Sequence, residues 1–114
     1  MTVANKPFQP SAEIFFWHDG DTFYGILDRG FDDYKGKHSK LIRVRMAKIN
    51  APELVDDGGI DAAKYADSLA PAGEYPVIPY KLDNYGRPLV DLILSGGRLF
   101  STEMLNSGHA KVYR

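Results

Sequence analysis

Apolar and polar residues in the first half of the chain follow the period of two that is typical of β-strands. An aromatic stretch at residues 14–17 leads into an Asp-Gly turn at 19–20, and residues 22–27 then alternate, so the two segments are expected to form a hairpin. A polar, glycine-containing segment at residues 29–39 is interpreted as an exposed loop, and residues 41–49 are the third expected strand. The chain is therefore predicted to begin with three strands.

The third expected strand carries two arginines. Its period of two places Arg43 and Arg45 on one face and Ile42, Val44 and Met46 on the other. Arginines on a strand face are usually solvated or paired with carboxylates, but a planar guanidinium can also hold two phosphate oxygens at once.

Helical spacing follows in the second half of the chain. Apolar residues recur at positions 62, 65, 66 and 69, which predicts a helix of about ten residues, ended by the proline and glycine at 71 and 73. A second, shorter helix is expected to start with Ser101 as its N-cap and to run through Asn106, with Gly108 as its stop.

Three further strands are expected at residues 77–82, 89–94 and 110–113. Prolines at 76 and 79 predict that the first of them is an edge strand or an irregular one. The pattern alone indicates a β-rich protein with two short helices and does not select a topology.

Length and composition predict a flexible N-terminal arm at residues 1–12 and a single domain at residues 13–114. The absence of cysteine excludes disulfide bonds, thiolate metal sites and thiol catalysis. A net charge of −1 argues against a high-affinity, non-specific nucleic-acid binder, but it is compatible with an enzyme whose site is locally positive. There is no secretory-signal pattern and no apolar run near the roughly 20 residues that span a bilayer, so we expect a cytoplasmic or otherwise intracellular monomer with no membrane partner.

Three polar segments share one chemistry. They are Asp-Gly-Asp-Thr at 19–22, Arg-Val-Arg at 43–45 continuing to Asn-Ala-Pro-Glu at 50–53, and Asp-Asn-Tyr-Gly-Arg at 83–87. Together they offer a carboxylate for a metal ion, a second carboxylate for a water molecule, and two separate arginines. Hydrolysis of a phosphodiester needs positive charge against its transition state and a group that orients the attacking water, so the set fits that reaction.

The same segments, in this order, resemble the staphylococcal nuclease (thermonuclease-like) family over about residues 13–113. The closing segment at 105–112 is similar to that family's last helix and strand. The resemblance implies a mainly β fold, an OB-fold-like five-stranded barrel with two short helices, here lacking the long C-terminal helix of many members.

The resemblance also implies a metal site, with Ca²⁺ or Mg²⁺ as the cofactor. Asp21 matches a metal-binding aspartate of the family, although two aspartates around a glycine are on their own most often a turn. Asn50 stands where the family most often has a second aspartate, so it offers an amide oxygen without charge, and the backbone carbonyl of Ala51 is a third oxygen ligand. Glu53 matches the residue that orients or deprotonates the attacking water.

Arg45 and Arg87 match the two phosphate-binding arginines of the family, whereas Arg43 has no counterpart and is assigned a structural or auxiliary role. Tyr85, and less strongly Tyr113, are candidates for stacking against a base or sugar of the substrate.

These roles imply a metal-dependent nuclease that cleaves DNA, and RNA as a further candidate substrate, with low sequence specificity. The alternative is a non-catalytic OB-type module that binds nucleic acid or a protein partner. Asn50 and the near-neutral net charge favour the alternative. Asp21, Arg45, Glu53 and Arg87 together favour the enzyme.

Overall fold

The computed structural model describes residues 8–29 and 41–113. The strands are β1 (Ser11–Asp19), β2 (Thr22–Asp28), β3 (Ile42–Met46), β4 (Ile49–Asn50), β5 (Gly73–Tyr80), β6 (Leu89–Leu92) and β7 (Lys111–Val112). The helices are α1 (Gly59–Leu69), the short 3-10 helix η2 (Ser95–Gly97) and α2 (Phe100–Asn106).

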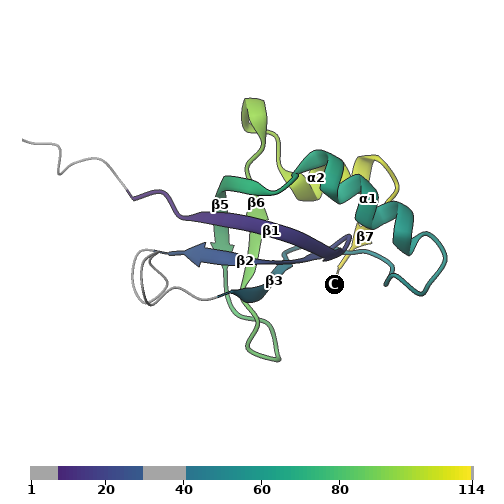
Figure 1. Ribbon diagram of the computed structural model, residues 1–114, viewed down its shortest axis with the longest axis horizontal. Coiled ribbons are helices and arrows are strands. Elements are labelled where there is room, and N and C mark those ends of the chain that lie inside the picture. Colours follow the sequence, from purple (N-terminus) through teal and green to yellow (C-terminus); the bar gives the residue numbers. More distant parts are fainter. Residues whose placement is uncertain (1–7, 30–40, 114) are drawn as a thin grey trace, which may run out of the picture.

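Five of the strands close into a barrel in the order β1-β2-β3-β6-β5. The neighbours are antiparallel except β3 and β6, which are parallel, and β4 and β7 pair separately as a small two-stranded sheet. Figure 1 shows α1 and α2 side by side against the barrel, close to β7. The predicted mainly β fold, an OB-like five-stranded barrel with two helices, is confirmed.

The first two strands form the predicted hairpin, in which Asp19 pairs with Thr22 across the turn. β1 begins at Ser11, so the end of the expected N-terminal arm belongs to the barrel. The rest of that arm up to residue 7, and the loop expected at 29–39 from residue 30 onward, lie outside the described residues.

The prediction of one continuous strand over residues 41–49 was wrong. β3 ends at Met46, the chain bends at Ala47 and Lys48, and β4 is only Ile49–Asn50. Lys48 has a φ of 73°, the left-handed conformation that a residue with a Cβ rarely adopts. The bend turns the chain around the Arg45 side chain, as the contacts described below show.

The strand expected at residues 77–82, as an edge or an irregular strand, is β5: it belongs to the closed barrel, so it is not an edge strand, and its pairing is irregular. Its first half pairs with β1, up to Pro76, and its second half pairs with β6, where Pro79 lies opposite Val90. Each half has its ladder on one side, so a proline, which has no N–H to donate, is tolerated in either half.

The second helix begins two residues earlier than predicted, at Phe100, and Ser101 is not its N-cap. Leu99 occupies the N-cap position, and its side chain makes no capping hydrogen bond. Instead, the buried carboxylate of Asp91 on β6 accepts hydrogen bonds from the backbone N–H of Ser101 (3.0 Å) and from its hydroxyl (2.5 Å). The predicted stop is confirmed, since the helix ends at Asn106 and Gly108 has a φ of 82°.

The core fills the barrel and the space between the barrel and the helices. Trp17 connects the two, since its ring stacks on Phe100 of α2 with centroids 4.8 Å apart and its Nε1–H donates to the carbonyl of Ala70 (2.8 Å). The fully buried side chains include Ile14, Phe23, Val44, Met46, Ile49, Val77, Val90, Leu92, Phe100 and Met104. No helix within residues 8–29 and 41–113 has the length and apolar character needed to cross a bilayer.

We predict that Asp91→Ala destabilises the fold by about 2–4 kcal/mol, because it leaves the buried Ser101 hydroxyl and the N–H groups of Leu92 and Ser101 without their acceptor. The measurement is urea unfolding followed by the fluorescence of Trp17, the single tryptophan. Asp67→Ala, which removes an exposed carboxylate of α1, is the control and should change stability by no more than about 0.5 kcal/mol. Equal effects of the two changes would contradict the capping role of Asp91.

Candidate active site

A cleft of about 800 Å³ opens at the end of the barrel where the β1–β2 turn, the end of β3 and the segment after β4 meet. Residues from 18 to 111 contribute to its walls. Six of the eight site residues expected from the sequence line it: Asp21, Arg45, Asn50, Ala51, Glu53 and Arg87.

The Asp21 carboxylate ties the β1–β2 turn to the segment after β4. One oxygen accepts a hydrogen bond from the Thr22 hydroxyl (3.0 Å) and the other accepts one from the backbone N–H of Ala51 (2.8 Å). Gly20 allows this approach, because a Cβ there would lie 2.8 Å from the Cβ of Ala51 and 3.0 Å from that of Ala62. Asp21 is buried, with 6% of its surface exposed, so its carboxylate is fixed rather than solvated.

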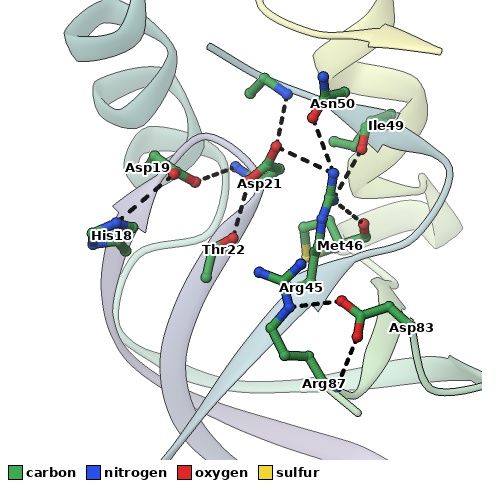
Figure 2. Close-up of polar contacts among 11 residues, drawn as sticks. His18, Asp19, Asp21, Thr22, Arg45, Met46, Ile49, Asn50, Asp83 and Arg87 are labelled. Carbon is green, nitrogen blue, oxygen red and sulfur yellow. Dashed lines mark hydrogen bonds and ion pairs between the residues drawn. The ribbon is translucent and has the colours of Figure 1, made fainter. Parts of the chain in front are cut away.

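The Arg45 guanidinium is held from several sides within the bend between β3 and β4 (Figure 2). Nη1 donates to the carbonyls of Met46 (3.1 Å) and Ile49 (3.2 Å), and Nη2 donates to the amide oxygen of Asn50 (3.0 Å). Nη2 also lies 3.8 Å from an Asp21 carboxylate oxygen. A guanidinium held in this way presents a cation of fixed orientation at the cleft wall.

Arg87 is oriented by Asp83, four residues earlier in the loop before β6. The Nε–H of Arg87 donates to Asp83 Oδ2 (2.6 Å), while the backbone N–H groups of Arg87 (2.8 Å) and Tyr85 (2.9 Å) donate to Oδ1. Loss of hydration alone would raise the pKa of Asp83, but these hydrogen bonds and the charge of Arg87 outweigh it and hold the pKa below its ordinary value. Asp83 therefore stays ionised and keeps the guanidinium in place.

Glu53 is exposed and lies at the cleft wall after Pro52. Its backbone carbonyl accepts a hydrogen bond from the N–H of Asp56 (2.9 Å), and a Cβ on Gly59 would lie only 1.8 Å from the same carbonyl oxygen. This tight turn fixes the Glu53 backbone while leaving its carboxylate open to solvent.

Asp19 is a site residue that the sequence reasoning treated only as part of a turn. Burial raises its pKa to about 7, with further contributions from the neighbouring carboxylates of Asp21 and Glu53, against a lowering hydrogen bond from the backbone N–H of Asp21. The elevation therefore reflects first the burial of the Asp19 carboxyl and second its closeness to the carboxylates of Asp21 and Glu53. The signal available in the sequence was the first aspartate of the same Asp-Gly-Asp turn.

Tyr85 and Tyr113 do not line the main cleft. They line an adjoining pocket of about 70 Å³ that shares Arg45 and Arg87 with it. The guanidinium carbon of Arg45 lies 5.0 Å from the centroid of the Tyr113 ring, and that of Arg87 lies 5.6 Å from the Tyr85 ring. Both rings are largely exposed beside the arginines.

Four basic or imidazole side chains of the cleft wall were given no site role by the sequence reasoning: His18, Arg43, His109 and Lys111. His109 is stacked on Tyr65 of α1, with ring centroids 4.6 Å apart. His109 and Lys111 lie far along the chain from the three motifs, so local pattern does not reveal them, whereas His18 directly precedes the first motif and Arg43 begins the second.

The cleft offers a metal ion oxygen ligands, which are the kind that hard cations prefer. Within residues 8–29 and 41–113, no three His, Cys, Asp or Glu side chains are grouped as a metal site. If a cation binds at Asp21, the amide oxygen of Asn50 and the carbonyl of Ala51 are the neutral ligands expected from the sequence. Such an all-oxygen set with a single direct carboxylate fits a hard cation such as Ca²⁺ or Mg²⁺, bound weakly.

The barrel and the cleft define the class: an OB-type domain whose cleft presents oriented arginines beside carboxylates. Residues 43–114, more than half of the chain, match the family described as staphylococcal nuclease homologue, and the chain belongs to this family. The resemblance inferred from the motifs is thereby confirmed. No curated protein matches the chain. The family match makes this a domain of nuclease or nucleic-acid-binding type.

We predict that Asp83→Asn lowers stability at neutral pH and that this loss shrinks as the pH falls. Because the folded pKa of Asp83 is lowered, its contribution is fully present above the unfolded value near 3.8 and is lost as the pH falls through the folded pKa. Urea unfolding of both proteins between pH 6 and pH 2 measures the difference. A difference that stays constant or grows with acidification would contradict the assignment.

Proposed function

We propose that this protein is a metal-dependent nuclease that hydrolyses phosphodiester bonds in DNA, with RNA as a second substrate, at low sequence specificity. The observation that carries the proposal is the single cleft that combines Asp21, Glu53, Arg45 and Arg87. Membership in the staphylococcal nuclease homologue family supports it. The monomeric state and the intracellular location stay predictions from the sequence.

Asp21, with the Asn50 amide oxygen and the Ala51 carbonyl, would hold the divalent cation. When bound, the cation supplies positive charge to the phosphate and lowers the barrier for attack on phosphorus. Asp21 is prepared for this role because its carboxylate is already fixed by Thr22 and by the N–H of Ala51.

Glu53 orients the attacking water. Its carboxylate is exposed at the cleft wall while its backbone is fixed, so it can accept a hydrogen bond from the water.

Arg45 and Arg87 stabilise the negative charge that accumulates on the phosphate oxygens. Both are held by acceptors before substrate arrives: Arg45 by the carbonyls of the bend and Arg87 by Asp83. Such preorganisation matters because donors that need no rearrangement stabilise the transition state most. Arg87, on the loop before β6, would also contact the leaving oxygen of the phosphodiester.

Tyr85 and Tyr113 provide aromatic surface next to these arginines for a base or sugar. Stacking accepts any base, which fits low sequence specificity.

One observation favours the alternative, a non-catalytic module that binds nucleic acid or a protein. Asn50 gives its amide oxygen to Arg45 (3.0 Å), and Arg45 lies 3.8 Å from Asp21, so the candidate metal site is partly balanced by an internal cation. The alternative predicts that nucleic acid binds without any divalent cation and is not cleaved.

The test of the proposal is degradation of single-stranded DNA and RNA by the purified protein with Ca²⁺, with Mg²⁺ and with a chelator. We expect metal-dependent cleavage that Glu53→Gln abolishes, which also excludes a contaminating nuclease. Arg87→Ala should lower the rate about 100- to 1,000-fold, as removal of one preorganised donor does. Arg45→Lys, which keeps the charge but loses the planar fork, should also be strongly impaired. Absence of cleavage by the folded protein with either metal would favour the binding module.

We further predict that Asn50→Asp raises the affinity for Ca²⁺ at least about tenfold, the equivalent of about 1.4 kcal/mol, because it adds a carboxylate to a site with one direct charged ligand. Isothermal titration calorimetry with Ca²⁺ measures the dissociation constant. Asn84→Asp makes the same change in charge on the exposed loop outside the cleft and is the matched control. Equal affinities in the two variants would show that Asn50 is not a ligand.

A further inference from the structure

A row of three side chains crosses the outer face of the barrel beside the cleft. Phe16 of β1 pairs in register with Tyr24 of β2, and Tyr24 pairs with Arg43 of β3. Directly paired residues on one face of a sheet have side chains in contact range, and Tyr24 contacts both Phe16 and Arg43.

The row is held together by stacking and by a cation. The rings of Phe16 and Tyr24 are stacked with centroids 4.9 Å apart and planes 22° apart. The guanidinium carbon of Arg43 lies 5.4 Å from the Tyr24 centroid, and its Nε and Nη2 donate to the Tyr24 hydroxyl (3.2 and 2.8 Å). Phe16 is nevertheless 52% exposed, so an ordered aromatic surface faces outward.

This surface is continuous with the candidate active site. His18 approaches the edge of Tyr24, with ring centroids 6.1 Å apart, and both His18 and Arg43 line the main cleft. Arg43 and Arg45 are two residues apart on β3, an advance of about 6.6 Å along a strand. We call Phe16, Tyr24, Arg43 and His18 the aromatic shelf.

Single exposed apolar residues are common and carry no meaning by themselves. Phe15, 45% exposed on the same strand, is an example, because among the described residues it makes no ring contact. The shelf differs from it in combining stacked rings, a paired cation and continuity with the cleft.

We propose that the aromatic shelf binds the substrate strand next to the scissile phosphate, with a base stacked on Phe16 and a backbone phosphate near Arg43. This inference rests on the proposed nuclease function and specifies its substrate as single-stranded nucleic acid. In the barrel order the shelf strands lie on one side of Arg45, and the Tyr85 loop before β6 lies on the other. The bound nucleic-acid strand therefore crosses the cleft from the aromatic shelf to the aromatic surface of the Tyr85 loop.

The occupant is single-stranded because a base must present a free face to stack on a side chain, and in a duplex both faces are taken by neighbouring bases. The charge of the shelf agrees, since Arg43 adds a cation where the strand carries phosphates.

The test measures binding separately from cleavage. Fluorescence anisotropy gives the Kd of labelled 12-nucleotide single-stranded DNA, RNA of the same sequence, and duplex DNA for the full chain carrying Glu53→Gln, which is expected not to cleave, with Ca²⁺ present. In this background, Phe16→Ala should weaken binding of the single strands at least about fivefold, the loss of one stacked base, while leaving duplex binding unchanged. Phe16→Tyr keeps the ring and should stay within about twofold. Phe15→Ala is the matched control and should leave binding unchanged.

A second arm links the effect to a base. Replacing one nucleotide at a time by an abasic residue should identify a position at which Phe16→Ala no longer weakens binding, because the base it contacts is already missing. Circular dichroism and urea unfolding establish that each variant is folded.

Three results would overturn the proposed role of the shelf. The first is that Phe16→Ala binds single strands as tightly as the parent, and the second is that Phe15→Ala weakens binding as much as Phe16→Ala does. The third is that single strands do not bind at all. These outcomes are independent of catalysis. Weaker binding of Phe16→Ala together with absence of cleavage by the wild-type protein would support the shelf and refute the nuclease. Normal cleavage by the wild-type protein, together with no effect of Phe16→Ala on binding, would support the nuclease and refute the shelf.

Discussion

The structure around the candidate site depends on one buried cation, the guanidinium of Arg45. Only 9% of this residue is exposed, and a charge removed from water must be compensated by several polar partners. The carbonyls of Met46 and Ile49 provide two of them, and they reach the guanidinium because β3 stops and the chain bends at Lys48. The left-handed backbone at Lys48 lies in the bend that brings these carbonyls to Arg45.

The same compensation joins parts of the chain that are distant in sequence. Asp21 faces Arg45 at 3.8 Å and also accepts the N–H of Ala51, so the hairpin turn, the end of β3 and the segment leading to Glu53 form one polar unit. The glycine at position 20 lets that unit press against the small side chains of the core. The same set of contacts therefore fixes both Arg45 and Asp21, the candidate metal ligand.

The parts of the fold that sequence predicted are those set by local pattern: the hairpin, the helix at Gly59–Leu69 and the stop at Gly108. The parts it missed depend on partners far away in the chain. Asp91 replaces Ser101 as the cap of α2 from another strand, and the break in β3 is caused by a guanidinium that pattern treated as an exposed face. The site shows the same division. Motifs predicted six residues that the fold gathers in one cleft, whereas the raised pKa of Asp19 and the orientation of Arg87 by Asp83 arise only from the folded neighbourhood.

In the proposed enzyme, the charges of the cleft couple the binding of the metal ion to the binding of nucleic acid. Five carboxylates line it, at Asp19, Asp21, Glu53, Asp56 and Asp57, against four basic side chains, at Arg43, Arg45, Arg87 and Lys111. In the proposed enzyme, a divalent cation among the carboxylates reverses this balance and reduces the repulsion that a phosphate meets. A phosphate near the arginines does the same for the cation. Binding of metal and of nucleic acid are therefore linked with the same sign, and each strengthens the other by an equal factor. If Asn50 is a ligand of the proposed enzyme, its amide adds no charge, so more of the attraction for the cation must come from the substrate phosphate, and the cation is expected to bind more tightly when substrate is present.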